Sequence, residues 1–219
     1  ITAIVARGLR FYLLAGLLFI FGEKIEVFIA RIRFATLIGS LIIEGPDMIS
    51  MISSSVSRDF ILCSIFPEMS KYDKRLYLAA CHLHDTMWQA HPDYRSEVCF
   101  ETVTGANLGG IDHEGRIFLA ISLMSRYKSS SLDKISNETM MILDKKLVKK
   151  AVTLGAAMRL GSMLSVTIAS NLEKTKILLS NDSICLDLKS DTDFFGETVE
   201  RRLTHLAGLM GVKPKIIVE

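Results

Sequence analysis

Apolar residues recur at helical spacing along four long segments of this 219-residue chain. One face of an α-helix repeats every 3.6 residues, so the pattern predicts a helix in each segment. The predicted helices span residues 74–88, 116–127, 145–169 and 195–210. His91 precedes Pro92, and the residue before a proline disfavours helical backbone, so we expect the first helix to end near His91. The middle of the chain is therefore predicted to be mainly α-helical.

A different pattern follows near the C-terminus. Two short apolar runs, Lys176–Leu179 and Ile184–Leu188, flank the turn residues Ser180–Ser183. Such an arrangement is typical of a β-hairpin. Lys215–Val218 comes directly after Pro214 and predicts a closing strand that could pair with the hairpin. The sequence thus predicts a small C-terminal α+β region, made of a hairpin, a helix and a strand.

The first 43 residues contain further apolar runs. Residues 3–21 predict one helix, and within it Phe11–Phe21 is continuously apolar. A helix that crosses a bilayer needs about 20 apolar residues and this run has about half of that, so a buried helix is favoured over a membrane helix or a signal-peptide core. Residues 25–30 could form a short strand, and residues 34–43 are ambiguous between a helix and a buried strand.

Residues 44–59 form the best candidate linker. They combine the turn residues of Glu44–Asp47 with small polar residues such as Ser53–Ser55. We place a domain boundary there. The chain begins with Ile1 rather than Met, which suggests a truncated or processed chain.

Composition narrows the class of protein. Hydrophobic residues make up 49% of the chain, enough for a sizeable core, and the formal net charge of +2 is too small to indicate nucleic-acid binding by itself. The cysteines have no CxxC spacing, and most lie in apolar surroundings that are typical of small buried thiols. They are Cys63, Cys81, Cys99 and Cys185. We therefore expect no structural disulfide and a reducing, cytoplasmic compartment.

An adjacent His-Asp pair lies at His84 and Asp85, and His113 follows further along. Such a pair on a helix is how HD-type phosphohydrolases begin a metal site, whose ligands must converge from several helices. The full pattern needs an earlier His and a late Asp, but no His precedes His82 and Arg159–Ser162 offers no carboxylate. We expect a vestigial HD-like site at these three residues with no bound metal; a functional metal site is the alternative.

Basic residues fall in several segments that could converge. They are Arg95, Arg116, Arg126, Lys128, Lys145, Lys146, Lys149, Lys150, Arg159, Arg201 and Arg202. Guanidinium groups bind phosphate oxygens in a bidentate way, so the set suggests a polyanion site with salt-sensitive affinity. The candidate contacts are Arg95, Arg116, Arg126, Lys145, Lys149 and Arg159. The alternative is that Lys145–Lys150 form a solvated helix face and that Arg116 and Arg159 make structural ion pairs.

Other familiar catalytic motifs are absent from the sequence. It contains no P-loop, no GxSxG elbow and no GxGxxG fingerprint, and Thr104–Gly110 is typical of a flexible loop. From the residues alone, the chain is a helical domain with a relic of a phosphohydrolase site.

A series of short motifs in fixed order resembles a known family. The motifs are Ala79–Asp85, Trp88, Ala90–Arg95, Asp112–Ala120, Arg159–Gly161, Glu200–Leu203, Leu206, Ala207 and Gly211. Each motif is weak, but their order resembles the C-terminal half of the exopolyphosphatase/guanosine pentaphosphate phosphatase family, in its alphaproteobacterial form. The resemblance extends from about Phe60 to the end of the chain.

The resemblance implies a domain organisation. It implies a remnant of an actin-like α/β domain over 1–45, a linker over 46–59, an HD-like helical domain over 60–170 and a small α+β domain over 171–219. In that family the catalytic residues belong to two N-terminal actin-like domains. The stretch Ile29–Ala35 lacks the Glu-Gly of the family's signature, and together with the non-Met start this suggests a fragment or a decayed copy.

The resemblance also implies a function. The chain would bind polyphosphate or a guanosine polyphosphate, would form a homodimer, and would contact neither nucleic acid nor membrane. Mg²⁺ is implied for the full-length family, and no cofactor for this chain. Whether the chain is itself an enzyme stays open. The alternatives are a metal-dependent HD phosphohydrolase that uses His84, Asp85 and His113, and a non-enzymatic dimerisation domain.

Overall fold

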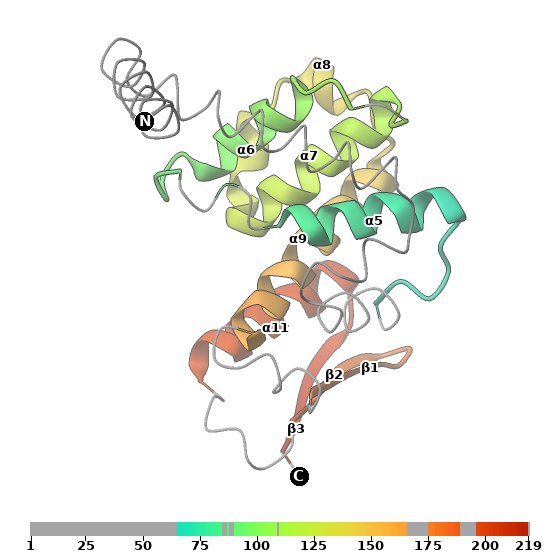
Figure 1. Ribbon diagram of the computed structural model, residues 1–219. Helices are drawn as coiled ribbons and strands as arrows, with labels where there is room; N and C mark the ends of the chain where they lie inside the picture. Colours follow the sequence, from blue (N-terminus) through green and yellow to red (C-terminus); the bar gives the residue numbers. More distant parts are fainter. Residues whose placement is uncertain are drawn as a thin grey trace, which may run out of the picture.

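The described part of the chain comprises residues 65–84, 87, 90–108, 110–165, 175–188 and 196–218 of a computed structural model (Figure 1). Several predictions lie outside these residues: the apolar helix over 3–21, the short strand over 25–30, the linker over 44–59 and the domain boundary within it. Asp85 and Trp88 also lie outside them.

A group of helices packed around one central helix forms the first part of the fold (Figure 1). The elements are α5 (Lys71–Leu83), α6 (Arg95–Thr104), α7 (His113–Tyr127), η1 (Ser129–Lys134), α8 (Asn137–Met140) and α9 (Lys145–Ser165). α7 contacts α5, α6 and α9. Along α7 every residue from Ile117 to Ser125 is buried, which is typical of a helix that is covered on all sides.

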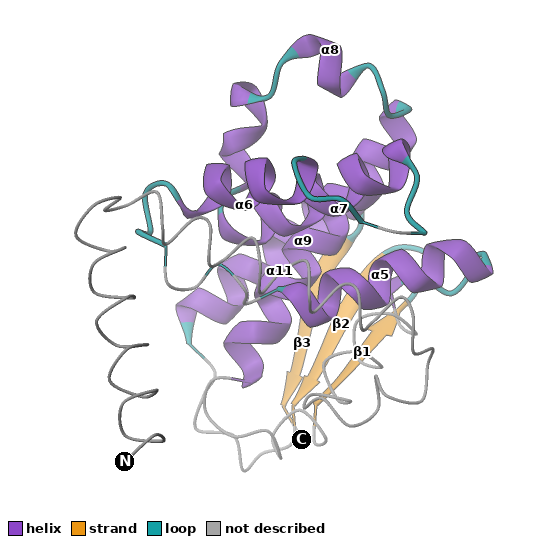
Figure 2. Cartoon of the chain, turned by 45° about the horizontal axis from the view of Figure 1, so that its top comes forward, coloured by secondary structure: helices purple, strands orange, loops and turns teal. Residues whose placement is uncertain are grey.

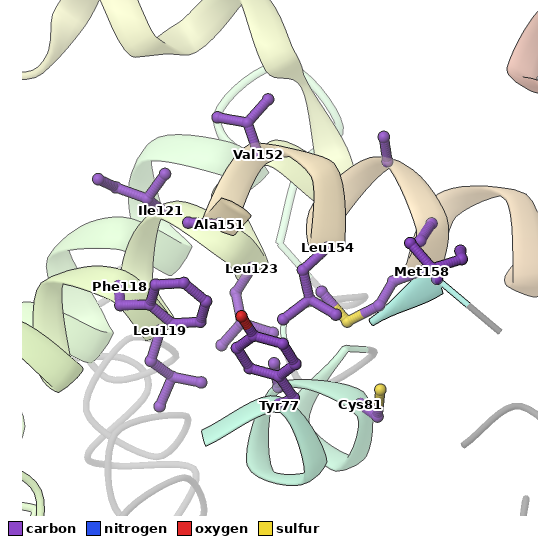
Figure 3. Packing of buried hydrophobic residues seen from close by; sticks show 14 of the residues in the cluster. Tyr77, Cys81, Phe118, Leu119, Ile121, Leu123, Ala151, Val152, Leu154 and Met158 are labelled. Carbon is purple, nitrogen blue, oxygen red and sulfur yellow. The ribbon is translucent and has the colours of Figure 1, made fainter. Parts of the chain in front are cut away.

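Aromatic packing joins α5 to α7 in the core. The ring of Tyr77 stacks on Phe118 with centroids 5.3 Å apart, and Phe66 meets Tyr77 edge-on at 4.9 Å. Figure 3 shows Tyr77 directed toward Leu123 of α7 and Leu154 of α9. Burial raises the pKa of Tyr77 to about 12, with the charge of Asp73 as a smaller cause. The phenol of Tyr77 therefore stays neutral and acts as a packing group.

Some helices begin or end at other residues than the apolar periodicity predicts, because capping residues set their ends. α5 begins at Lys71 because Ser70 and Asp73 form a capping box, in which each side chain binds the other's backbone N–H. α5 ends at Leu83, so the prediction of a helix that continues almost to His91 was wrong. α6 was not predicted at all, since only a few of its residues are buried and its apolar face is narrow.

A small three-stranded sheet with one helix forms the second part of the fold (Figure 2). β1 (Thr175–Leu179) and β2 (Ser183–Leu188) form the predicted antiparallel hairpin. α11 (Glu197–Met210) then leads to β3 (Lys213–Val218), which lies parallel to β2. α11 ends because Gly211 adopts a left-handed backbone with φ of 76°, a conformation that favours glycine. The mainly α architecture and the closing strand are thus confirmed.

The two parts share one hydrophobic core. Alternate strand residues, including Ile184, Leu186 and Leu188, face Leu203 and Leu206 of α11 in that core. α9 contacts both α7 and α11 and so links the parts (Figure 1). Among the described residues, no helix has the length and apolar character needed to cross a membrane.

The backbones of α7 and α9 lie in close contact where the two helices cross at Gly155. A Cβ atom at Gly155 would lie 2.6 Å from the carbonyl oxygen of Ser122, 2.6 Å from the Cβ of Ser125 and 2.9 Å from the backbone nitrogen of Arg126. A side chain at this position would therefore force the two helices apart. The glycine is required by the closeness of the helices.

We expect Gly155→Ala to lower the free energy of unfolding by about 1–3 kcal/mol, because overpacking a tight contact costs that much. Gly208→Ala in α11 is the matched control, since nothing lies within 4 Å of its added methyl group. The control should raise the free energy of unfolding by up to about 1 kcal/mol, because alanine favours a helix more than glycine does. Urea unfolding of both variants tests this, and equal effects would contradict the close crossing.

Candidate functional site

Four arginines lie on α9 and on the two helices that pack against it, α7 and α11. Arg126 lies in the last turn of α7, Arg159 in α9, and Arg201 and Arg202 near the start of α11. Burial lowers the pKa of Arg159, and the positive charges of Arg202, Arg126 and Arg201 lower it further. Burial and the charge of Arg201 likewise lower the pKa of Arg202. We call these four residues the arginine cluster.

The helix crossing explains why the arginine cluster forms. The backbone of Arg126 lies against Gly155, and Arg159 follows Gly155 by one turn of α9. α11 packs on α9 through buried residues such as Val199 and Leu203, which leaves Arg202 half-buried beside them. The three helices therefore present their guanidinium groups to a shared region of the molecule.

Three arginines of the cluster form no ion pair with a carboxylate of the described residues. Within the described ranges, no carboxylate forms an ion pair with Arg159, Arg201 or Arg202, and every charge that shifts the pKa of Arg159 is positive. Glu197 stands one turn before Arg201 on α11 but does not pair with it. Like charges held together in this way repel one another.

A further observation concerns the Nε atom of Arg202. It is buried and has no hydrogen-bond acceptor among the described residues. A buried donor without a partner costs about 1–3 kcal/mol, and guanidinium can only donate. An anionic oxygen would satisfy this donor and offset the repulsion within the cluster.

Tyr127 connects the arginine cluster to the predicted HD-like residues. Its ring lies 4.8 Å from the Cζ atom of Arg126 and 5.5 Å from that of Arg95. Its hydroxyl donates a 2.9 Å hydrogen bond to the carbonyl oxygen of His84. The Nδ1 atom of His84 lies 2.6 Å from the carbonyl oxygen of Cys81, within its own helix. His84 thus takes part in local contacts that hold Tyr127 in place.

The described residues give a metal ion little to bind. Among them, no group of three or more His, Cys, Asp or Glu side chains is arranged to hold a metal. His113 is exposed at the first position of α7, and Asp85 lies outside the described ranges. The arginine cluster itself offers only donors, which do not fit the oxygen ligands that Mg²⁺ requires. The HD-like metal site therefore stays a prediction.

Asp112, the first residue of the motif Asp112–Ala120, has a structural role. Its Oδ1 atom accepts hydrogen bonds from the backbone nitrogen of Gly115 at 2.8 Å and from the hydroxyl of Tyr72 at 2.6 Å, so it caps α7. These two bonds, the Tyr72 bond first, hold the pKa of Asp112 below its usual value. A side chain at Gly115 would displace the hydroxyl of Tyr72 that donates to Asp112.

The remaining candidate contacts lie at varied distances from the cluster. Arg95 donates through Nε and Nη2 to the carbonyl oxygen of Ala90, at 3.0 and 2.9 Å, and its Cζ atom lies 5.5 Å from the ring of Tyr127. Arg116 lies nearly three turns before Arg126 on α7. Lys145 and Lys149 are exposed in the first turns of α9. Of the six candidates, Arg126 and Arg159 are the two whose charges act on each other, since the charge of Arg126 lowers the pKa of Arg159.

Two residues of the cluster were not among the six candidates. Arg201 and Arg202 belong to the basic set noted in the sequence, and the signal that singles them out is their adjacency beside the buried Val199 and Leu203. On an amphipathic helix, a residue at such a position lies at the edge of the buried face. Their approach to Arg159 depends on tertiary packing, which the sequence pattern does not contain.

Comparison with models of protein families gives a match over most of the chain. The family model described as exopolyphosphatase, C-terminal, matches residues 60–217. The matched range contains the helical part, the arginine cluster and the three-stranded sheet. A search of the curated proteins finds no match.

We expect the helix cap at Asp112 to make stability depend on pH. Between its lowered pKa in the folded chain and the usual carboxyl pKa of about 4, the unfolded state binds more protons, so stability rises with pH there. The contribution is complete above the usual value and is lost as the pH falls through the lowered one. Asp112→Asn keeps a capping side chain but cannot titrate in this range.

Urea unfolding at a series of acidic pH values measures this effect. The stability advantage of the wild type over Asp112→Asn should shrink as the pH falls. Asp133→Asn, which removes an exposed carboxylate from η1, is the control and should not reproduce that trend. A difference between the wild type and Asp112→Asn that is the same at every pH would contradict the assignment.

Proposed function

Since the chain belongs to the exopolyphosphatase C-terminal family, we propose that its described domain holds a phosphoanhydride chain on the arginine cluster. The chain would be polyphosphate or the phosphates of a guanosine polyphosphate. The observation that carries the proposal is the half-buried Arg159, on which the positive charges of Arg202, Arg126 and Arg201 act. A domain without a polyanionic ligand would gain stability by placing a carboxylate there.

Guanidinium chemistry suits such a ligand. Each guanidinium group can donate two parallel hydrogen bonds to phosphate oxygens and keeps its charge at neutral pH. Successive phosphoryl groups each carry negative charge, so a chain can neutralise several arginines at once. Contributions from three helices favour an extended anion over a single compact one.

The arginine cluster supports binding rather than bond cleavage. Arginine stays protonated at neutral pH and so is no general base. In our proposal, residues 60–170 are the HD-like helical domain and 171–219 the small domain of an exopolyphosphatase-like protein. Hydrolysis of the terminal phosphoanhydride, and the Mg²⁺ it uses, would then belong to the family's N-terminal actin-like domains.

The proposal predicts that Arg159→Gln weakens polyphosphate binding about tenfold or more, because a hydrogen bond to a charged group contributes about 1.5–3 kcal/mol. Fluorescence anisotropy of end-labelled polyphosphate measures the affinity, which should fall as salt is added. Arg75→Gln is the matched control, since Arg75 is an exposed arginine of α5 outside the cluster. Competition with unlabelled polyphosphate and with guanosine pentaphosphate shows which source of the phosphate chain is preferred.

The stability of Arg159→Gln without ligand gives a second readout. Its free energy of unfolding should equal or exceed that of the wild type, because the substitution removes a charge that its neighbours repel. A loss of about 3 kcal/mol or more would indicate a structural ion pair and contradict the proposal. So would wild-type protein that does not bind polyphosphate at low salt.

A further inference from the structure

The first two turns of α9 present lysines to solvent on one face. Residues 151–158 of α9 are all buried, whereas the six residues before them are exposed or half-buried, so the start of the helix extends out of the core. The exposed ones are Lys145, Lys146, Lys149 and Lys150. At about 100° per residue, the four lysines fall within an arc of about 140° on one side of the helix. We call these four residues the lysine face.

The lysine face departs from the charge pattern that usually stabilises a helix surface. Opposite charges four residues apart attract and like charges repel, yet Lys145 stands four residues before Lys149, and Lys146 four before Lys150. The first turn of α9 contains no acidic residue. Asp144, just before the helix, has its Oδ1 atom 3.5 Å from the backbone nitrogen of Lys146. In the described part of the chain, no carboxylate forms an ion pair with any of the four lysines. Such a departure from local rules is typical of functional surfaces.

A large apolar side chain is exposed beside the lysine face. Met141 is 83% exposed, the highest value among the large hydrophobic residues of the described ranges. It is the C-cap residue of α8 and precedes Lys145 by four residues, so the two lie within about 14 Å of each other. α8 stands at the end of the helical part that lies away from the three-stranded sheet (Figure 1, Figure 2). Met141 and the lysine face therefore belong to one surface at that end.

This surface is separate from the arginine cluster. Lys150 precedes Arg159 by nine residues, which is about 14 Å along the axis of α9. A partner of the lysine face is therefore independent of the phosphate chain proposed for the arginine cluster.

The chemistry of the surface fits an anionic membrane better than other polyanions. Lysine clusters attract anionic lipid headgroups, and an exposed apolar side chain beside them can enter the boundary between headgroups and acyl chains. Lysine is depleted at protein–protein interfaces. Nucleic-acid sites read bases with arginine and stack them on aromatic rings, and residues 141–150 contain neither.

We propose that the lysine face and Met141 bind the anionic surface of a lipid bilayer. The ammonium groups of the lysines lie at the headgroups, and Met141 enters the boundary with the acyl chains. Binding of this kind is peripheral and reversible, and it needs no helix that spans the membrane. It departs from the expectation, taken from the resemblance, that the chain contacts no membrane.

The test uses the full chain of 219 residues and its sedimentation with phosphatidylcholine vesicles, with and without one third phosphatidylglycerol. We expect binding to the anionic vesicles at low salt, little binding to the neutral ones, and a loss of binding as NaCl is added. Lys145→Gln/Lys149→Gln should weaken binding about 25-fold, because each lysine near an anionic surface contributes about fivefold, or about 1 kcal/mol. Lys71→Gln/Lys74→Gln, which removes two exposed lysines of α5, is the matched control and should bind as the wild type does.

Met141 gives a second, independent readout. The tryptophan fluorescence of Met141→Trp should shift to the blue when anionic vesicles are added, because the indole enters an apolar environment. The wild type, whose one tryptophan is Trp88, serves as the blank. Circular dichroism checks that each variant folds.

Several results would overturn the proposal. They are an absence of binding to anionic vesicles at low salt, an equal loss of binding in the two lysine pairs, and a Met141→Trp spectrum that the vesicles leave unchanged. If Lys145→Gln/Lys149→Gln weakened the binding of soluble polyphosphate or RNA but not of vesicles, the lysine face would belong to that ligand instead. Arg159→Gln should leave vesicle binding unchanged, so failure of this proposal and failure of the proposed function are distinguishable.

Discussion

The close crossing of α7 and α9 at Gly155 is the contact on which the rest of the domain depends. It lets α7 lie at the centre of the helical part, covered on all sides, and it directs α9 toward α11. Because Arg126 stands at the crossing and Arg159 one turn beyond it, the same contact that closes the core also brings two guanidinium groups together. Packing and charge placement are therefore set by one glycine.

The charge arrangement works against stability. Arg159 and Arg202 are partly removed from water beside other positive charges, and the Nε atom of Arg202 has no acceptor among the described residues. Departures of this kind from the most stable arrangement are typical of functional sites. The HD-like histidine fits this account, since its backbone anchors Tyr127, whose ring lies against Arg126.

The sequence predicts the fold where local rules are strong. The helices around Phe118 and Leu154 have clear periodicity, and the hairpin has an unambiguous turn between two apolar runs, so both were found. α6 was missed because its buried face is narrow. The end of α5 was misplaced because it was inferred from Pro92, whereas the helix ends at its C-cap residue, His84. For the site, the sequence supplied the right residue types, but it could not show that Arg201 and Arg202 approach Arg159. That approach depends on contacts between helices far apart in the chain.

The most direct test of the account is whether an anion binds at the arginine cluster itself. Two-dimensional NMR of arginine side chains follows each Nε–Hε group while tripolyphosphate is added to the isotope-labelled chain. The account predicts saturable shifts for Arg159 and Arg202, with Arg75 unchanged. Shifts of equal size for exposed arginines and for the cluster, or none at the cluster, would contradict it.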